Sequence, residues 1–160
     1  MQSSAIYGAS EIYGCTVIIV IDAWALVIMH FPEGTGSEIN TLESESETND
    51  KIIGPLLDEL FLFEWTDQVV AYIVHYITTP PGPGIKLIKE NLVLNNLPVE
   101  NIKEKPYTRL RPTTGHRGKV AVTWDPLEEG SAELRLYIGN DDSEYVRQFD
   151  QDGTQCDFIG

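Results

Sequence analysis

The feature that most constrains the fold is the stretch of residues 15–31, which is apolar along almost its whole length. Residues 17–21 are all β-branched, and their stiff side chains favour a pleated strand over a helix. Asp22 and Ala23 interrupt the run before a second apolar segment, residues 24–31. The pattern predicts a β-hairpin buried on both faces, at the centre of a sheet with a second layer on each side.

This hairpin places a thiol opposite an imidazole. If Asp22 and Ala23 form the centre of the loop, residues whose numbers add up to 45 face each other, as Cys15 and His30 do. Directly opposed residues hold their Cβ atoms about 4.5–5.5 Å apart. An imidazole at that range can take the thiol proton, and the thiolate is the nucleophile. The spacing therefore predicts a Cys–His pair suited to attack on acyl carbons such as amides and thioesters.

The rest of the chain mixes strand and helix patterns. With 160 residues and 42% hydrophobic content, a single domain spanning residues 1–160 is expected. Periodicity and turn residues predict an α+β fold. The predicted strands are a short one within 1–13, then 69–78, 119–126, 132–139 and an edge strand at 145–149, and the predicted helices are 50–64 and 85–97.

Two polar connections accompany these elements. Residues 34–50 are rich in acidic and hydroxyl side chains, which predicts a flexible, solvated loop, with a lid over a nearby site as the alternative. Residues 106–118 carry three arginines and His116, and we expect a solvated connector or a local basic patch there.

Composition limits the partners. The chain has 25 acidic and 11 basic residues, a formal charge of −14, which opposes binding to nucleic acid or to anionic membranes. Asp22 divides the longest apolar run, so no membrane span of about 20 residues is expected. No secretory signal is expected from residues 1–4, and a cytoplasmic protein and a secreted or translocated effector both stay open. The cysteines and histidines lack metal-ligand spacing, so neither metal nor cofactor is expected.

A family resemblance follows from the hairpin. Gly14, Cys15 and Thr16 precede an apolar strand, and His30 precedes a Phe-Pro pair. Over about residues 12–33 this pattern resembles the active-site hairpin of the cytotoxic necrotizing factor and CheD group of protein-glutamine deamidases. The resemblance implies a central antiparallel or mixed β-sandwich flanked by helices. It also implies a protein substrate that carries a reactive glutamine.

The same resemblance implies a role for each residue. Cys15 would attack the glutamine carboxamide, and His30 would act as base and then as acid, so that glutamate and ammonia form through a thioester. Backbone N–H groups around Gly14 and Thr16 would stabilise the oxyanion. Ser10 is a candidate for orienting His30, with a main-chain carbonyl as the alternative. Tyr13 stands where the toxin members have Ser.

Two other functions remain open. One is a non-catalytic, acidic protein-binding domain on the same scaffold, which docks a basic partner; a merely solubilising surface would have the same charge. The other is a secreted effector in which Cys15 and Cys156 form a disulfide.

Overall fold

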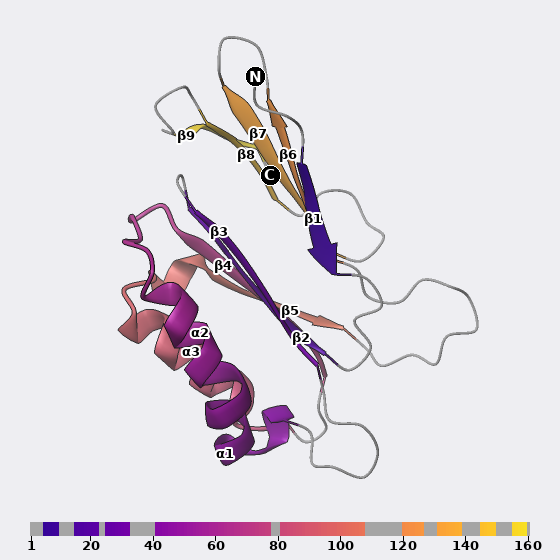
Figure 1. Cartoon of the computed structure of the whole chain (residues 1–160), viewed down its shortest axis with the longest axis vertical. Coiled ribbons are helices and arrows are strands. Elements are labelled where there is room, and N and C mark those ends of the chain that lie inside the picture. The colour runs from indigo at the N-terminus through magenta and orange to yellow at the C-terminus, as the bar shows by residue number, and fades with distance from the viewer. Residues whose placement is uncertain are drawn as a thin grey trace, which may run out of the picture. The chain divides into compact units, whose positions relative to one another are not determined.

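The computed structural model describes residues 5–9, 15–22, 25–32, 41–77, 81–107, 120–126, 131–138, 145–149 and 155–159 (Figure 1). The chain divides into two compact units, Gly14–Arg109 and the combination of Met1–Tyr13 with Leu110–Gly160. Each unit contains a β-sheet, and the first also contains the helices, so the α+β class is confirmed. The single-domain and sandwich arrangements stay predictions.

The unit Gly14–Arg109 is a mixed sheet with helices on one face (Figure 1). Its described strands are β2 (Thr16–Ile21), β3 (Leu26–Phe31), β4 (Val70–Tyr76) and β5 (Ile102–Tyr107), in the order β3-β2-β4-β5. β2 runs antiparallel to both neighbours, whereas β4 and β5 are parallel and joined through helix α3 (Gly84–Leu94). All six residues of β2 are buried, so the predicted central position is confirmed for this strand. It was wrong for β3, which lies at the edge of the described sheet with most of its residues half-buried or exposed.

The core of this unit lies between the sheet and the helices. β-branched and small side chains of the strands meet leucine and isoleucine side chains of the helices in one buried cluster. Its members include Ile18, Val20, Ala71 and Ile73 from the sheet and Ile52, Leu56, Leu60, Ile88 and Leu92 from the helices. Burial of these apolar side chains is the main stabilisation of the layer.

The segment predicted as a flexible acidic loop is helical over its second half. The chain forms η1 (Thr41–Glu43), α1 (Glu45–Thr48), the π-helical turn η2 (Asn49–Ile53) and α2 (Gly54–Leu60). The loop prediction was wrong for residues 41–50, because Ser44 caps α1: its hydroxyl accepts from the Glu47 N–H at 3.3 Å. Residues 34–40 lie outside the described part.

Pro55 explains the wide turn η2. Proline has no N–H to donate to the carbonyl four residues earlier, and its ring crowds that carbonyl. In the structure the Gly54 N–H donates to the Asn49 carbonyl, five residues back, which is the π-helical spacing. The helix predicted at 50–64 therefore begins earlier and ends at Leu60.

Several predicted elements are confirmed with small changes at their ends. The strand predicted at 69–78 is β4, and the helix predicted at 85–97 is α3, after which Asn96 adopts a positive φ of 67°. β5 was not predicted, and Pro106 and Tyr107 belong to it, so the loop begins later than expected. Residues 108–118, with His116, lie outside the described part.

The other unit is an antiparallel sheet. Among its described residues the strands are β1 (Ala5–Ala9), β6 (Val120–Pro126), β7 (Ala132–Ile138), β8 (Tyr145–Phe149) and β9 (Gln155–Ile159), in the order β1-β6-β7-β8-β9. The predicted β6–β7 hairpin is confirmed, with Pro126 opposite Ala132. The prediction that 145–149 forms an edge strand was wrong, because β9 pairs along its outer side.

Candidate functional site

The register of the β2–β3 hairpin differs from the prediction. Val17 lies opposite His30, and Thr16 lies opposite Phe31, so Cys15 does not face His30 directly. The chain turns one residue later than expected: the Asp22 N–H donates to the Ala25 carbonyl at 2.9 Å. Asp22 is therefore outside the tip of the loop.

Asp22 sets this register because it is a buried anchor. It is 5% exposed, and its carboxylate accepts from the N–H and the hydroxyl of Thr66, both at 2.6 Å. Charge-assisted hydrogen bonds of this kind are short and strong. They tie the end of β2 to the segment that leads into β4, and the loop forms beyond them.

The shift separates Cys15 from its predicted partner. Moving the turn by one residue moves each partner by two. His30 faces Val17, and Cys15 lies before β2, outside the paired residues of the hairpin, so the described residues show no Cys–His pair. His30 is exposed on β3, whereas Cys15 is 9% exposed.

The other predicted site residues have different outcomes. The Cys15 carbonyl accepts a hydrogen bond from the Tyr107 hydroxyl at 2.5 Å, which fixes the start of β2 against β5. Thr16 is buried within β2. Ser10 and Gly14 lie outside the described residues, and so does the side chain of Cys156 in β9.

A hydrogen-bonded cluster that sequence reasoning missed joins three elements of the helix-covered sheet. His75 Nε2 on β4 lies 2.9 Å from Glu104 Oε1 on β5, and Lys89 on α3 donates to the other carboxylate oxygen. His75 Nδ1 lies 2.9 Å from the Tyr76 carbonyl. The hydrogen bond from Lys89 lowers the pKa of Glu104, outweighing the opposing effect of burial. The three residues are far apart in the sequence, and no local motif predicts that they form a cluster.

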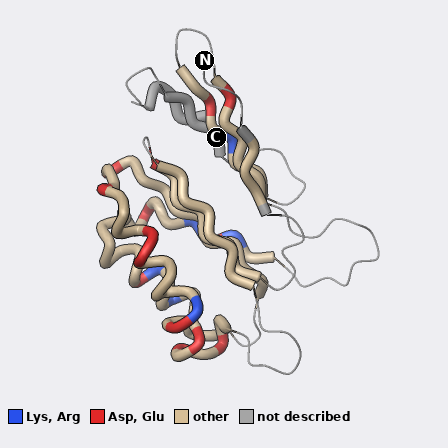
Figure 2. Tube along the Cα trace, in the orientation of Figure 1, with Lys and Arg blue, Asp and Glu red and all other residues tan. Residues whose placement is uncertain are grey.

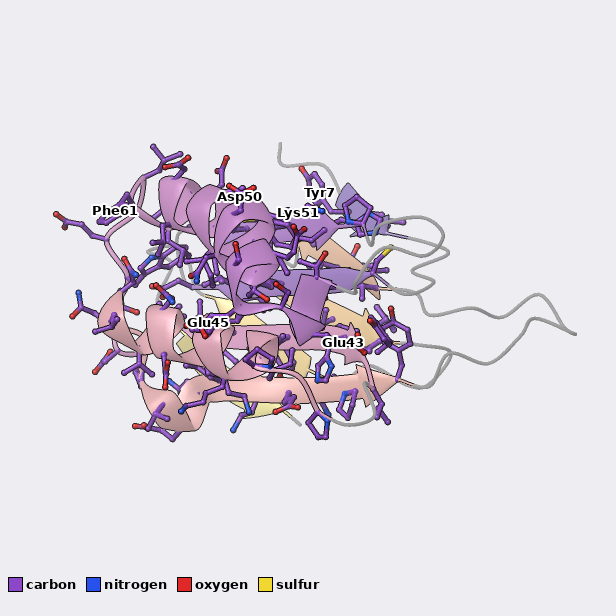
Figure 3. The ribbon with its side chains drawn as sticks, turned by 90° about the horizontal axis from the view of Figure 1, so that it is seen from below. Tyr7, Glu43, Glu45, Asp50, Lys51 and Phe61 are labelled. Carbon is purple, nitrogen blue, oxygen red and sulfur yellow. The ribbon has the colours of Figure 1, made fainter. Side chains whose placement is uncertain are left out.

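A groove at the C-terminal ends of α2 and α3 is a second feature that sequence reasoning missed. It has a volume of about 250 Å³ and is lined by Leu60, Phe61, Phe63, Glu64, Trp65, Asn95 and Asn96. Phe61, Leu62 and Leu94 are 76%, 70% and 77% exposed. Figure 3 shows Phe61 at the opposite end of the helical layer from Glu43. Large apolar side chains are thus exposed together around one concave surface.

Local structure fixes this groove. α2 ends at Leu60, and the Trp65 indole donates to the Leu60 carbonyl at 3.3 Å, which folds the following residues back over the helix end. The Phe63 and Trp65 rings lie 5.3 Å apart between centroids, in a tilted arrangement. Phe61 follows the last helical turn and does not reach the core.

On the α2 side of the groove the charged residues near it in the sequence are all acidic. Residues 52–85 contain no lysine or arginine, while Asp58, Glu59, Glu64 and Asp67 flank the groove in sequence. Figure 2 shows acidic positions and no basic ones along α2 and the segment that follows it. The groove therefore combines apolar walls with a negative surround.

Metal binding and membrane insertion find no support in the described residues. No group of three or more His, Cys, Asp or Glu side chains among them could hold a metal ion. No helix in the part of the chain that was searched is long and apolar enough to cross a membrane.

No family model, curated protein or solved structure matches this chain. The deamidase resemblance of the hairpin stays a prediction.

Proposed function

We propose that this protein binds a partner protein through the groove at the ends of α2 and α3, and that the partner contributes a basic amphipathic helix. The observation that carries the proposal is the exposure of Phe61 and Phe63, 76% and 39%, in the lining of a concave, partly aromatic surface, with Leu62 and Leu94 exposed next to lining residues in the sequence.

Exposed apolar residues are ordinary when they are scattered. Contiguous ones with a polar rim mark surfaces that bind protein or another apolar partner. Here Phe61 and Phe63 line the groove together with Trp65, and Asn95 and Asn96 form a polar edge. Aromatic side chains are the residues that most often supply the anchors of protein interfaces.

The acidic residues beside the groove favour a partner with basic side chains. A helix that lies in a groove inserts apolar side chains at positions i, i+3, i+4 and i+7 and turns its polar face outward. Lysine or arginine on that polar face would meet Asp58, Glu59 and Glu64 and would be attracted over the range of the Debye length. An acidic helix would be repelled by the same residues.

Isothermal titration with a synthetic amphipathic helix tests this function. One peptide carries leucines at the four anchor positions and lysines elsewhere, and its control has glutamates in place of the lysines. We expect the lysine peptide to bind, the glutamate peptide to bind at least tenfold more weakly, and Phe61→Ser to weaken the lysine peptide about thirtyfold, the loss of one interface anchor.

A matched variant separates groove binding from general attraction to an acidic protein. Ile77 is 49% exposed and lies at the far end of β4, so Ile77→Ser removes an exposed apolar side chain away from the groove. It should leave the affinity unchanged. Equal effects of Phe61→Ser and Ile77→Ser, or equal binding of both peptides, would contradict the proposal.

A second candidate function is the cysteine-dependent deamidase, with Cys15 as nucleophile and His30 as base. It is supported by the position of both residues at the same end of the hairpin, with Cys15 directly before β2 and His30 opposite Val17 on β3. Ser10, Gly14 and Thr16 keep the roles that the resemblance implies.

Alkylation with iodoacetamide tests this second candidate. An activated Cys15 should label faster than a model thiol, and His30→Ala should slow the labelling. Cys15→Ser should fold normally and release no ammonia from a glutamine-bearing protein. Slow labelling that His30→Ala does not change would contradict the deamidase candidate.

A further inference from the structure

The end of the helical layer opposite the groove contains a half-open cavity of about 260 Å³ between the β2–β3 hairpin and the helices η1 and η2. It is lined by Thr16, Phe31, Pro32, Thr41, Leu42, Lys51 and Ile52. We propose that this cavity binds a small, uncharged molecule made of an apolar ring or branched chain with one hydrogen-bond acceptor. The proposal is independent of the protein-binding groove.

The size and the walls of the cavity suit a compact apolar body. A cavity of about 150 Å³ lined by aliphatic and aromatic side chains holds benzene. The present cavity is larger, and Phe31, Pro32, Leu42 and Ile52 supply apolar walls. A substituted six-membered ring therefore fits without displacing the surrounding side chains.

One wall is held in place by close packing. A Cβ atom added at Gly84 would lie 2.7 Å from the Leu42 Cα, so the backbone of η1 rests directly on the start of α3. The Thr48 hydroxyl also donates to the Thr41 carbonyl at 2.7 Å in a buried hydrogen bond. Because the wall is already ordered, a ligand need not spend binding energy on ordering it.

The charge at the cavity is already neutralised. Lys51 lines it, and the Lys51 ammonium lies 2.5 Å from the Glu47 carboxylate, one turn away on the same helix. An anion at the cavity would have to compete with Glu47, and a cation would be opposed by Lys51. The pairing favours an uncharged ligand.

A buried hydroxyl supplies the polar handle. Thr16 and Thr41 are 3% and 4% exposed, and the buried Oγ1 atom of Thr41 has no hydrogen-bond partner in the described part of the chain. A buried donor without an acceptor is costly, so a rotation of the Thr41 side chain that presents its hydroxyl to an acceptor on the ligand is favoured. A carbonyl or ether oxygen provides such an acceptor without adding charge.

Two probes that differ only in the acceptor test the inference. Acetophenone has a carbonyl oxygen, and ethylbenzene has nearly the same shape without it. Titrated into the full chain and followed by amide chemical shifts, both should perturb Thr16, Thr41, Leu42 and Ile52 in a saturable way. Thr41→Val, which keeps the side-chain shape, should weaken acetophenone about threefold to tenfold and leave ethylbenzene unchanged.

The chain offers a matched control for the loss of a hydroxyl. Thr123 on β6 also has a buried Oγ1 without a partner among the described residues, and it does not line this cavity. Thr123→Val should leave both affinities unchanged. Absence of saturable shifts, shifts centred on other residues, or an equal response of both probes to Thr41→Val would overturn the proposal.

Discussion

The two ends of the helical layer differ in how far their apolar side chains are exposed to solvent. At one end Leu42 is 2% exposed and packs onto the start of α3. At the other end Phe61, which lines the groove, is 76% exposed, and Leu94, next to the lining residue Asn95 in the sequence, is 77% exposed. The first end is closed in the sense that its apolar side chains are packed, and the second is open because its apolar side chains reach solvent.

This difference teaches where substitutions should act. Tightly packed residues carry stability, since any change of volume among them must be absorbed by their neighbours. Exposed residues carry little stability, and selection for folding alone does not explain why large apolar ones cluster there. Substitutions at the closed end should change the free energy of unfolding, and substitutions at the open end should change binding.

The largest effect on stability is expected at Asp22, which anchors the open end. Asp22→Ala removes two charge-assisted hydrogen bonds to the buried Asp22 carboxylate and leaves the half-buried Thr66 donors without this acceptor. We expect a loss of about 3 kcal/mol in the free energy of unfolding, measured by urea denaturation. A loss below 1 kcal/mol would show that the anchor does not hold the hairpin to the segment before β4.

The next effect is expected at the closed end. Gly84→Ala places a Cβ against the Leu42 backbone and the Thr48 hydroxyl, each at 2.7 Å, and should cost about 2 kcal/mol. Gly54→Ala is the matched control, because its Cβ would come no closer than 3.7 Å to another group, the Asn49 carbonyl oxygen. Gly54 is helical and precedes Pro55, whose ring disfavours a Cβ there, so that variant should cost up to about 1 kcal/mol, less than Gly84→Ala. Equal effects of the two substitutions would remove the packing argument for a preformed cavity.

A smaller effect is expected at Glu104, which links β5 to α3 between the two ends. Its pKa in the folded protein lies below the ordinary value of 4.5, chiefly because Lys89 donates to the carboxylate. The corresponding stability is present above that value and is lost as the pH falls through the folded-state pKa. Glu104→Gln should flatten the decline of the unfolding midpoint below pH 4.5. The side chain is 35% exposed, so solvent screening keeps the effect modest.

The smallest effect on stability is expected at Phe61. Because the side chain is 76% exposed, Phe61→Ser should change the free energy of unfolding by less than about 0.5 kcal/mol. The same variant should lose most of the peptide affinity. A large loss of stability on thermal unfolding would mean that Phe61 serves the fold and not the groove.

Local sequence patterns predicted most elements, and non-local contacts decided what those patterns missed. The turn after β2 is set by Thr66, which is 44 residues away from Asp22. β5 has the sequence IKEKPY, which lacks strand alternation and is held as a strand by its parallel pairing with β4. No local pattern contains these partners.

The groove was missed for a different reason. The periodicity of residues 50–64 predicted one helix with Phe61 on its core-facing side, whereas α2 ends at Leu60. The four consecutive apolar residues at 60–63 were the available signal, because a helix cannot turn all four toward one face. Neither the groove nor the cluster of His75, Glu104 and Lys89 follows from a motif.

The most direct test of the account is an amide chemical-shift titration of the full chain with the lysine-bearing amphipathic peptide. The account predicts saturable shifts confined to residues 60–65 and 93–96 around the groove. Shifts spread over the acidic positions near Glu43, Glu45 and Asp50, with none at the groove, would show attraction to a charged surface alone and would contradict it.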